Sequence, residues 1–586
     1  MEWWLTEFNG VKLDIAMVGY FILLPILLLG ISSFIKSSVL SKVSFIYCLI
    51  LAIFCTIVSI VDLELFKQWG SKINAQFFIY LQNPKEAFAS SASSPVFLLV
   101  LIGIIQITLF LLLYKWLFKF MKTEKLSFNW LNIPLLILLL GVSFLAIRGG
   151  VGTIPNNQSV AYFSSKNDLN NASLNSVWNA FYFVFTGDNL QYNTFKLYSD
   201  NELNDFKNKI SKKSIGTIKI LNESAKSPNV VLVVLESWAS DVVGCLESKE
   251  NLTPYFDSLS ANGLLFSNCY ATGVRTDKGI SAILSGFPAQ ADASAIMYPE
   301  KSQKLPSVLK EFNDYSSLFI YGGDPSFANM KIYIKNMGFE TIKDKSDFSK
   351  EEQNSKWGAH DGVMLNKSVE WMNGLKQPFF TSILTLSSHE PFEVPTGTFY
   401  KGEDEYSKFK NSIMYSDKSV HEFIEKCKMQ PWFNNTVFVF VADHGRNTDV
   451  KYPIRFHPGF FKIPLMIYSP LLKDSLKGRR EISLVSQTDV PAILENIKGE
   501  KFQDDFTYSI SPFNERQREF VYYAYYDGAA VFKNDTAVYY DNISKLDFAI
   551  TVTDSTKFKA PNLAKKAKLY QQTVMEDFFN LSKNTD

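Results

Sequence analysis

Cysteine, histidine and net charge are all scarce in this sequence. Its 586 residues include 5 cysteines and 5 histidines, and 59 basic against 58 acidic residues leave a net charge of +1. The cysteines show no C-x-x-C spacing, which argues against a thiolate metal site, and the three that lie outside apolar runs cannot all pair with one another. A disulfide framework therefore does not organise the fold, and the balanced charge gives no argument for a nucleic-acid partner.

Long apolar runs, by contrast, are abundant before residue 150. Four uncharged stretches each have about the ~20 residues that a membrane-spanning helix needs. They are Ile15–Phe34, Val43–Val61, Pro95–Tyr114 and Leu126–Ile147. Four such runs rarely cluster in a soluble protein, and no basic start or small-residue cleavage site marks the first as a signal peptide. The sequence thus predicts a multi-pass transmembrane domain over residues 1–150.

The lysines in the loops predict how this domain is oriented. Residues 35–42 and 115–125 together hold six lysines, whereas residues 62–94 hold three that are offset by three acidic residues. The positive-inside rule then places the first and third loops in the cytoplasm and everything after Arg148 on the outer face. Residues 151–226 are polar with helical stretches, and we expect them to form a juxtamembrane helical linker.

From Asn229 onward the pattern changes to short apolar runs rich in Val, Ile and Phe. The four clearest runs are Val230–Leu235, Ser317–Tyr321, Phe379–Leu386 and Thr436–Ala442. Such runs are typical of strands buried on both faces, and helical patterns such as Leu305–Phe312 and Ser416–Lys428 lie between them. The alternation predicts an α/β domain over 227–500, with helices on both faces of its sheet. A hairpin signal at Asp527-Gly528 and a helical C-terminus predict a small subdomain over 501–586.

Polar side chains follow each of these four strands. They are Glu236, Asp324, His389 and the pair Asp443-His444, in chain order. Because open α/β sheets bind ligands beyond the carboxyl ends of their strands, we expect these side chains to gather at one edge. Glu236, Asp443 and His444 are ligands suited to Zn²⁺ or Mn²⁺.

Thr276 is the candidate nucleophile because it lies just before a helical pattern. A hydroxyl at a helix N-terminus sits where unpaired amide N–H groups attract phosphate. Coordination to a metal would lower its pKa and activate it. Taken alone, Thr276 is better explained as a helix cap, and Asp443-His444 as a strand-end turn. Together with Glu236 they favour a catalytic metal site.

Five further side chains near these motifs keep two interpretations open. Arg275, Lys278 and Arg446 either stabilise phosphate charge or are solvated. His360, in the segment Trp-Gly-Ala-His-Asp, and Asp324 belong either to the site or to structural turns.

The order and spacing of the motifs are specific. They are the segments Val231–Trp238, Gly273–Gly279, Tyr321–Met330, Trp357–Asp361, Ser388–Phe392 and Asp443–Gly445. Together with the apolar runs, they resemble the alkaline-phosphatase superfamily, and within it the lipoteichoic-acid-synthase-like phosphoglycerol transferases with sulfatase-type domains.

This resemblance implies an alkaline-phosphatase/sulfatase-like α/β domain with a mixed, mainly parallel sheet, carried by a bacterial inner-membrane protein with its catalytic domain on the periplasmic side. The implied ligands of one divalent metal, commonly Mn²⁺ with Zn²⁺ as the alternative, are Glu236, Thr276, Asp443 and His444. His389 would contact the substrate phosphate or its leaving group. His457 is similar to a histidine that follows the Asp-His pair in related phosphoethanolamine transferases.

The implied activity is transfer of a phosphoglycerol-type head group from a phospholipid donor to an envelope glycan or polymer, through a phosphothreonine at Thr276. The chain lacks the Trp and Arg that bind phosphate in lipoteichoic acid synthases near the positions of Ala328 and Met330, and Asp324 and Asn329 instead resemble a Gram-negative branch. No C/S-x-P-x-R motif surrounds Thr276, which disfavours sulfate-ester hydrolysis. Two alternatives stay open: a phosphoethanolamine transferase or hydrolase on the same site, and a non-catalytic, membrane-anchored envelope-binding protein.

Overall fold

The computed structural model describes residues 2–31, 37–69, 72–73, 77–78, 81, 94–119, 130, 132–151, 155–156, 158–161, 167–186, 195–211, 218–291, 293–325, 328, 330–395, 399–402, 404–445, 452, 454, 456–503, 506–515 and 517–581. Arg446 and Asn329 lie outside these residues. The chain divides into two compact units, which we describe separately.

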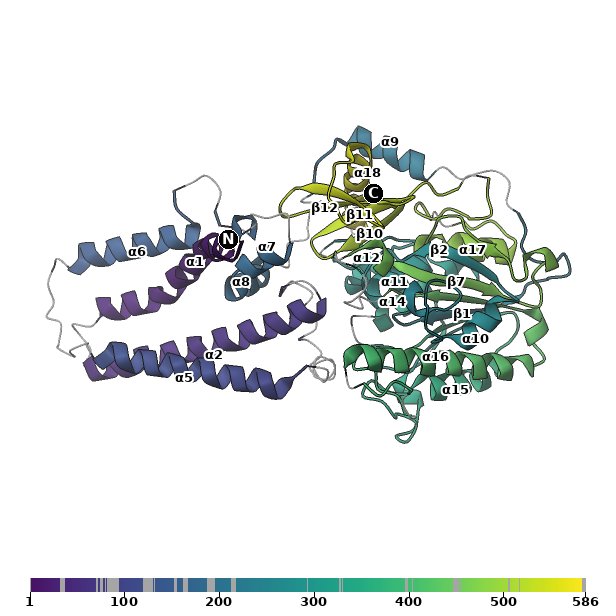
Figure 1. Ribbon diagram of the computed structural model, residues 1–586, viewed down its shortest axis with the longest axis horizontal. Helices are drawn as coiled ribbons and strands as arrows, with labels where there is room; N and C mark the ends of the chain where they lie inside the picture. Colours follow the sequence, from purple (N-terminus) through teal and green to yellow (C-terminus); the bar gives the residue numbers. More distant parts are fainter. Residues whose placement is uncertain are drawn as a thin grey trace. The chain divides into compact units, whose positions relative to one another are not determined.

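The first unit contains the apolar helices (Figure 1). Three of them are long and apolar enough to cross a membrane: α1 (Glu2–Gly30), α2 (Ser37–Trp69) and α5 (Val96–Lys119). Three of the four predicted spans are therefore found, and they make the chain a membrane-anchored protein. The fourth, α6 (Asn132–Arg148), has 17 residues, or ~25 Å, against a hydrocarbon core of ~30 Å. Its predicted start at Leu126 lies outside the described residues.

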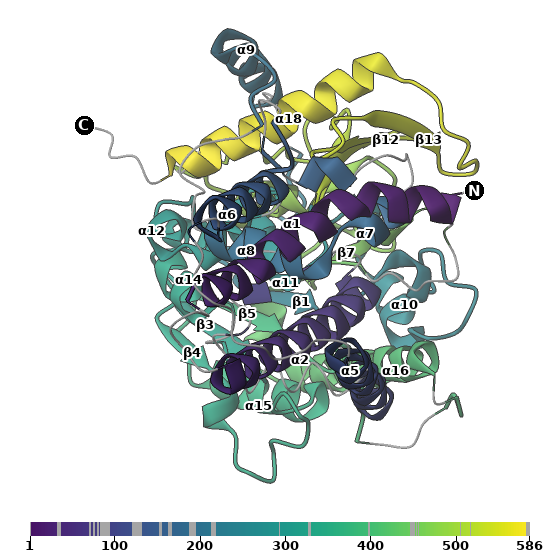
Figure 2. The ribbon, with the colours of Figure 1, turned by 90° about the vertical axis from the view of Figure 1, so that its left-hand side faces the viewer.

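These helices pack in pairs within the first unit. Helix α1 lies against α6, and α2 lies against α5, as Figure 2 also shows. Three short helices follow: η2 (Gln158–Ala161), α7 (Asn167–Ser173) and α8 (Ser176–Thr186). A small apolar core that includes Leu13, Met17 and Trp178 joins them to α1.

The second unit is built on a mixed, mainly parallel sheet, as predicted. Its strands are β1 (Asn229–Leu235), β2 (Leu264–Tyr270), β3 (Ser316–Tyr321), β4 (Thr341–Lys343), β5 (Phe379–Leu384), β6 (Thr436–Ala442), β7 (Lys462–Tyr468), β8 (Arg480–Glu481) and β9 (Val485–Ser486). They are ordered β4-β3-β5-β1-β6-β7-β2-β8, with β9 paired to β2. Strand β7 runs antiparallel to both of its neighbours, and the other described pairs in this sheet are parallel.

Helices cover both faces of this sheet (Figure 1). They are α10 (Pro254–Ser260), α11 (Thr276–Ser285), α12 (Pro299–Ser302), α13 (Val308–Glu311), α14 (Met330–Met337), α15 (Asp361–Asn373), α16 (Glu405–Lys428) and α17 (Val490–Lys498). Helix α16 contacts both α10 and α15, while α11 contacts α13 and α17. Strands β1, β5 and β6 are fully buried between these layers. Their continuous apolar sequence follows from that two-sided burial.

Two predicted helices have different bounds in the structure. The pattern at Leu305–Phe312 forms only the four-residue α13, because Ser307 caps it through a hydrogen bond from the Leu309 amide (3.2 Å) just after Pro306. Helix α16 begins at Glu405 rather than Ser416. Asp404 accepts a hydrogen bond from the Ser407 amide (3.0 Å) at its start.

The C-terminal part forms a second, antiparallel sheet beside the first. Its strands are β10 (Val521–Tyr525), β11 (Gly528–Lys533), β12 (Thr536–Asp541) and β13 (Asp547–Thr551). The first two make the hairpin that Asp527-Gly528 predicts. The long helix α18 (Pro561–Asn580) packs on β11 and β12, and α9 (Asp200–Ile210) packs on α18.

Short 3-10 helices complete the described connections of this unit. They are η3 (Ser240–Val242), η4 (Ala295–Met297), η6 (Lys345–Asp347), η7 (Phe433–Asn435), η8 (Pro458–Phe460), η9 (Asp474–Leu476) and η10 (Gln487–Asp489).

Candidate active site

Glu236 and Asp443 lie side by side because their strands are parallel neighbours. Strand β1 pairs with β6 in a register that sets Leu235 opposite Ala442, so the residue that follows each strand is at the same level. Strand β5 flanks β1 on its other side, and the loop after it carries His389. The centre of the sheet thus delivers polar side chains from three adjacent strands to one edge.

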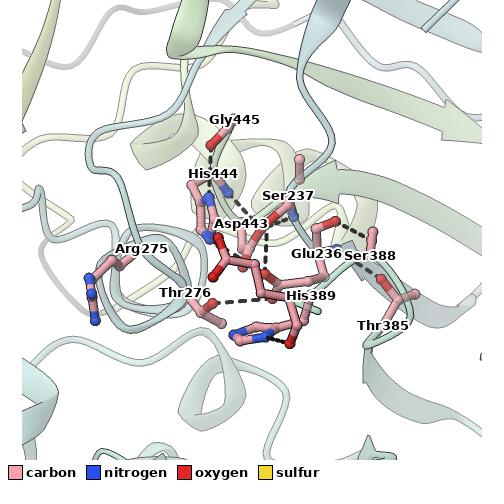
Figure 3. Close-up of polar contacts among 12 residues, drawn as sticks. Glu236, Ser237, Arg275, Thr276, Thr385, Ser388, His389, Asp443, His444 and Gly445 are labelled. Atoms are coloured by element: carbon pink, nitrogen blue, oxygen red, sulfur yellow. Dashed lines mark hydrogen bonds and ion pairs between the residues drawn. The ribbon is translucent and has the colours of Figure 1, made fainter. Parts of the chain in front are cut away.

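His444 completes a compact group of potential metal ligands (Figure 3). Ligand atoms of Glu236, Asp443 and His444 all lie within 4.8 Å of one another. His444 Nε2 is 3.5 Å from Glu236 Oε1 and 3.5 Å from Asp443 Oδ2. Its Nδ1 faces the Gly445 carbonyl at 2.8 Å. A carbonyl only accepts hydrogen bonds, so Nδ1 carries a hydrogen and Nε2 is the ring nitrogen that is available to a metal.

Backbone hydrogen bonds fix the two carboxylate-bearing turns. The Glu236 amide donates to Thr385 Oγ1 (2.8 Å), and the Glu236 carbonyl accepts from Ser388 Oγ (2.6 Å). The Ser237 amide donates to Asp443 Oδ1 at 2.9 Å. Ser237 has a φ of 59°, in the left-handed region that non-glycine residues rarely adopt. This sharp turn after β1 aims its amide at Asp443, which is the kind of local strain that functional sites retain.

The chemistry of this group fits a divalent metal. Asp443 is fully buried, and its Oδ2 accepts no hydrogen bond from any residue that the structure describes. A buried carboxylate oxygen without a partner is costly unless a cation faces it. Two carboxylates and one imidazole nitrogen are the donors that Zn²⁺ and Mn²⁺ accept. Glu236, Asp443 and His444 would therefore hold such an ion.

The pKa values show the same need for positive charge. Burial alone would raise the pKa of Glu236, but the hydrogen bond and charge of His444 outweigh it and lower that pKa well below its usual range. Burial and the neighbouring Glu236 charge raise the pKa of Asp443. Burial lowers the pKa of His444, yet the two carboxylates raise it to about 9. Without a metal, the group thus keeps protons where a cation would sit.

Thr276 faces this group from helix α11. It is the first residue of the helix, and Thr276 Oγ1 donates to Glu236 Oε2 at 3.2 Å. Arg275, rather than Thr276, occupies the N-cap position. The first amides of a helix have no partner within the helix and attract anions. Thr276 therefore presents its hydroxyl beside both the carboxylate group and a helix N-terminus of the kind that attracts anions.

Gly279 allows α11 to come this close. A Cβ at this position would lie 2.0 Å from the Asp443 carbonyl oxygen and 2.7 Å from its carbon. We expect Gly279→Ala to push α11 away and separate Thr276 from Glu236. Overpacking against backbone costs about 1–3 kcal/mol, and we expect activity to fall more than about tenfold because positioning errors of this size are costly. Thermal unfolding and turnover of the purified full-length variant measure both effects.

Gly374→Ala is the matched control. Gly374 is exposed at the end of α15, and its added Cβ would meet its nearest atom at 3.4 Å. We expect unchanged turnover and stability. If Gly279→Ala behaves like this control, the close approach of α11 does not position Thr276.

His389 lies beside Thr276 and Glu236 (Figure 3). Its Nδ1 faces the Glu390 carbonyl at 3.0 Å, so Nδ1 carries a hydrogen and Nε2 is left for other partners. The ring packs edge-on against Trp357, with centroids 4.5 Å apart. Asp361 fixes the preceding loop, because its Oδ1 accepts hydrogen bonds from the amides of Leu386 (2.7 Å) and Ser387 (3.1 Å).

Arg275, Lys278 and Asp324 are not part of the ligand group. Arg275 Nε donates to the Tyr526 hydroxyl (3.2 Å), and its side chain lies to one side of the group in Figure 3. Lys278 is buried rather than solvated, and its Nζ donates to the Gln290 carbonyl at 2.6 Å. Asp324 is exposed after β3, which β5 separates from β1. The ends of β3 and β1 are two strand spacings apart, which is ~10 Å across the sheet.

The two remaining predicted histidines have structural partners. His360 is buried, with Nδ1 2.9 Å from Asn354 Oδ1 and Nε2 2.8 Å from the Glu393 carbonyl. His457 is also buried; its Nδ1 accepts from the Gly459 amide (3.1 Å), and its Nε2 lies 3.3 Å from the Val552 carbonyl. Both rings use both nitrogens to hold loops together. Arg446 lies outside the described residues.

Sequence reasoning missed the residues that hold the site in place. Gln487 is fully buried, and its Nε2 donates to the carbonyls of Ala442 (2.7 Å) and Asp443 (2.6 Å). Its Oε1 accepts from the Thr272 amide at 3.3 Å, which ties the segment before α11 to the end of β6. A lone Gln in a polar stretch gives no signal for this role. Thr385 lies at the end of a predicted strand and Ser388 follows it, close to His389, so both were recognisable as polar strand-end residues.

The segment that holds the mixed sheet, the ligand group at its edge and the threonine at the start of the facing helix is similar to a sulfatase-type domain. Residues 228–510 match the profile of the family described as Sulfatase.

Curated relatives of similar sequence are lipoteichoic acid synthases. Lipoteichoic acid synthase-like YvgJ of Bacillus subtilis (strain 168) is 26% identical over 231 residues, which cover 38% of this chain and 37% of that protein. Lipoteichoic acid synthase 1 of the same organism is 25% identical over 234 residues, covering 38% and 37%. The matched segment thus spans just over a third of the length of these relatives.

Two solved structures share the fold. A protein in the alkaline phosphatase superfamily from Vibrio parahaemolyticus has a TM-score of 0.58 at 23% identity, covering 67% of this chain and 98% of that one. The lipoteichoic acid synthase LtaP from Listeria monocytogenes has a TM-score of 0.53 at 19% identity, covering 66% and 99%. The fold-class prediction is confirmed by these likenesses, which concern the fold alone.

Proposed function

We propose that this protein is a membrane-anchored, metal-dependent phosphotransferase that moves a phosphoglycerol-type head group from a phospholipid to an envelope glycan or polymer. The observation that carries the proposal is the Thr276 hydroxyl, 3.2 Å from Glu236 Oε2 and next to the buried Glu236, Asp443 and His444. The relatives named as lipoteichoic acid synthases support this substrate class. The helices α1, α2 and α5 would keep the domain at a membrane surface, on the periplasmic side by the lysine distribution.

Transfer would proceed in two displacements. Thr276 loses its hydroxyl proton to solvent, and the ionised Oγ1 attacks the phosphorus of the donor. An Oγ1–P bond forms, and the bond from phosphorus to the diacylglycerol oxygen breaks. His389 Nε2, when protonated, gives its proton to the departing oxygen. The acceptor hydroxyl then attacks the phosphothreonine and gives its proton to His389, and the P–Oγ1 bond breaks. A divalent metal held by Glu236, Asp443 and His444, Mn²⁺ or Zn²⁺, would supply Lewis-acid stabilisation of the phosphoryl charge and would lower the pKa of Thr276.

The N-terminus of α11 would also stabilise the charge of the reacting phosphoryl group. Its first amides point toward the position that an incoming phosphoryl group takes on reaching Thr276 Oγ1. Asp361, Trp357 and Gln487 hold the flanking loops, so the reacting groups need little reorganisation.

A covalent adduct on Thr276 is the decisive test. We expect intact-mass and peptide mass spectrometry of the full-length protein, incubated with phosphatidylglycerol and Mn²⁺ or Zn²⁺, to find glycerophosphate on the peptide that contains Thr276. Phosphatidylethanolamine is the parallel donor, and an adduct from it alone would make the protein a phosphoethanolamine transferase. Release of the head group without an adduct or transfer to an acceptor would favour a hydrolase. Neither adduct nor product, with no bound metal, would favour the non-catalytic binding protein.

A further inference from the structure

A cavity opens between α2 and α5 of the first unit, at the end where α2 begins and α5 ends. It encloses about 620 Å³, within the range of small-ligand sites. Its lining combines two lysines with aromatic and aliphatic side chains: Lys42, Phe45 and Ile46 of α2, and Leu111, Tyr114 and Lys115 of α5. Both helices carry part of it, and both lie in the same compact unit.

The shapes of the paired side chains explain why the cavity is there. Farther along the pair, Gly103 lets the helices approach, and a Cβ there would lie 3.2 Å from Ile60 Cδ1. Toward the other end, large rings separate them: Phe45 packs edge-on against Tyr114 with centroids 5.1 Å apart, and Tyr114 stacks on Phe118 at 4.0 Å. Gly103 thus allows a close approach at one place, while the Phe45–Tyr114 ring pair joins α2 to α5 at the other end, where the groove is lined by aromatic rings.

The polar groups of this groove have no partner among the residues that the structure describes. Neither Lys42 nor Lys115 forms an ion pair or hydrogen bond with any described residue. The Tyr114 hydroxyl is buried and makes no hydrogen bond within the described part of the chain. A buried hydroxyl without a partner costs free energy that an external acceptor would recover. Two ammonium groups and one hydroxyl donor form a set complementary to a phosphate monoanion, and the apolar walls suit an acyl chain.

The two lysines of the groove lie at the depth of a lipid head group rather than at the depth of the end of an acyl chain. Lys42 is five residues after the start of α2 and Lys115 four before the end of α5. These offsets correspond to ~6–8 Å along each helix, so both ammonium groups reach the membrane interface. This is the lysine-rich end that the loop charges assign to the cytoplasm.

We propose that the groove between α2 and α5 binds an anionic glycerophospholipid, with its phosphate on Lys42, Lys115 and the Tyr114 hydroxyl and an acyl chain along Ile46 and Leu111. The site lies in the membrane unit, and it is distinct from the Glu236, Asp443 and His444 group of the second unit. It does not depend on the proposed transfer reaction.

Native mass spectrometry of the full-length protein in detergent tests the proposal, with phosphatidylglycerol and phosphatidylcholine of identical acyl chains as probes. We expect tighter binding of phosphatidylglycerol. Each lysine near a phosphate is worth ~1 kcal/mol, so we expect Lys42→Gln or Lys115→Gln to weaken it about fivefold and the double variant about 30-fold. The charge-preserving Lys42→Arg/Lys115→Arg variant should retain the preference.

Lys67→Gln is the matched control, because Lys67 lies exposed at the opposite end of α2. It should bind both lipids as the unchanged protein does. Metal binding by the second unit reports whether each variant is intact. Equal affinity for the two lipids, or an undiminished preference in the double variant, overturns the proposal. A photoreactive phosphatidylglycerol that labels Ile46 or Leu111 peptides supports it, and labelling confined to other helices contradicts it.

Discussion

Thr276→Ala is expected to abolish transfer while metal binding stays largely intact. The substitution removes the only atom of this side chain that faces Glu236, but it leaves the carboxylates and His444 in place. Loss of a nucleophile costs on the order of 10⁴-fold or more in turnover. Head-group transfer from phosphatidylglycerol measures the first quantity, and metal content of the purified variant measures the second.

Two companion variants make this result interpretable. Thr276→Ser keeps a hydroxyl at the start of α11 and should retain measurable turnover. Thr341→Ala removes the same group from an exposed position on β4 and should have no effect. If Thr276→Ala keeps more than a few per cent of the activity, the nucleophile is another group, and the proposed phosphothreonine is wrong.

Asp443→Asn is expected to have the second largest effect, on metal affinity and through it on stability. The carboxylate is fully buried, and its Oδ2 has no hydrogen-bond partner among the described residues. An amide at this position brings no negative charge to a cation. A metal that binds only the folded state stabilises it by about 2.7 kcal/mol at 100 times its Kd. We therefore expect Mn²⁺ or Zn²⁺ to raise the Tm of the unchanged protein by several degrees, and a chelator to reverse this.

The variant should show almost no such rise, and its Tm should not respond to the chelator. Asp474→Asn is a suitable control, because Asp474 is an exposed carboxylate paired with Lys477 at 2.8 Å. A metal-dependent Tm that survives in Asp443→Asn would place the ion somewhere else.

The same group predicts how metal affinity depends on pH. The carboxylates raise the pKa of His444 to about 9, so the metal-free protein holds a proton on this imidazole at pH 7. A metal must displace that proton. Apparent affinity should therefore rise about tenfold per pH unit below pH ~9 for each proton released. Metal titrations between pH 6 and 8 measure the slope, and a flat profile would show that His444 is not a ligand.

Local sequence patterns were enough to predict much of the fold. Runs without charged residues marked β1, β3, β5 and β6 to within two residues, because strands buried on both faces exclude charged side chains. Strands β2 and β7 escaped notice, although β2 carries the chain to α11 and β7 is the antiparallel member of the sheet. Strand pairing across long sequence separations leaves no local signature.

The residue types of the ligand group could also be predicted from the sequence, whereas the roles of the individual residues could be assigned only from the tertiary structure. Glu236, Asp443 and His444 each follow a strand, and parallel neighbours bring strand ends together, so the group was predictable. His360 and His457 looked similar to site residues, yet their ring nitrogens bind loop groups that only the folded chain brings near them. Lys278 likewise turned out to be buried against Gln290.

By itself, then, the sequence determined the two-part organisation, the α/β class and the residue types at the strand ends, because hydrophobic periodicity and strand-end chemistry are local properties. Tertiary structure decided how the strand ends are aligned, which polar groups are left unpaired and which residues hold them. Segments far apart in the chain meet where Gly279 approaches Asp443, where Gln487 donates its hydrogen bonds to the end of β6, and at the turn of Ser237. Such contacts depend on packing in three dimensions, and no local pattern encodes them.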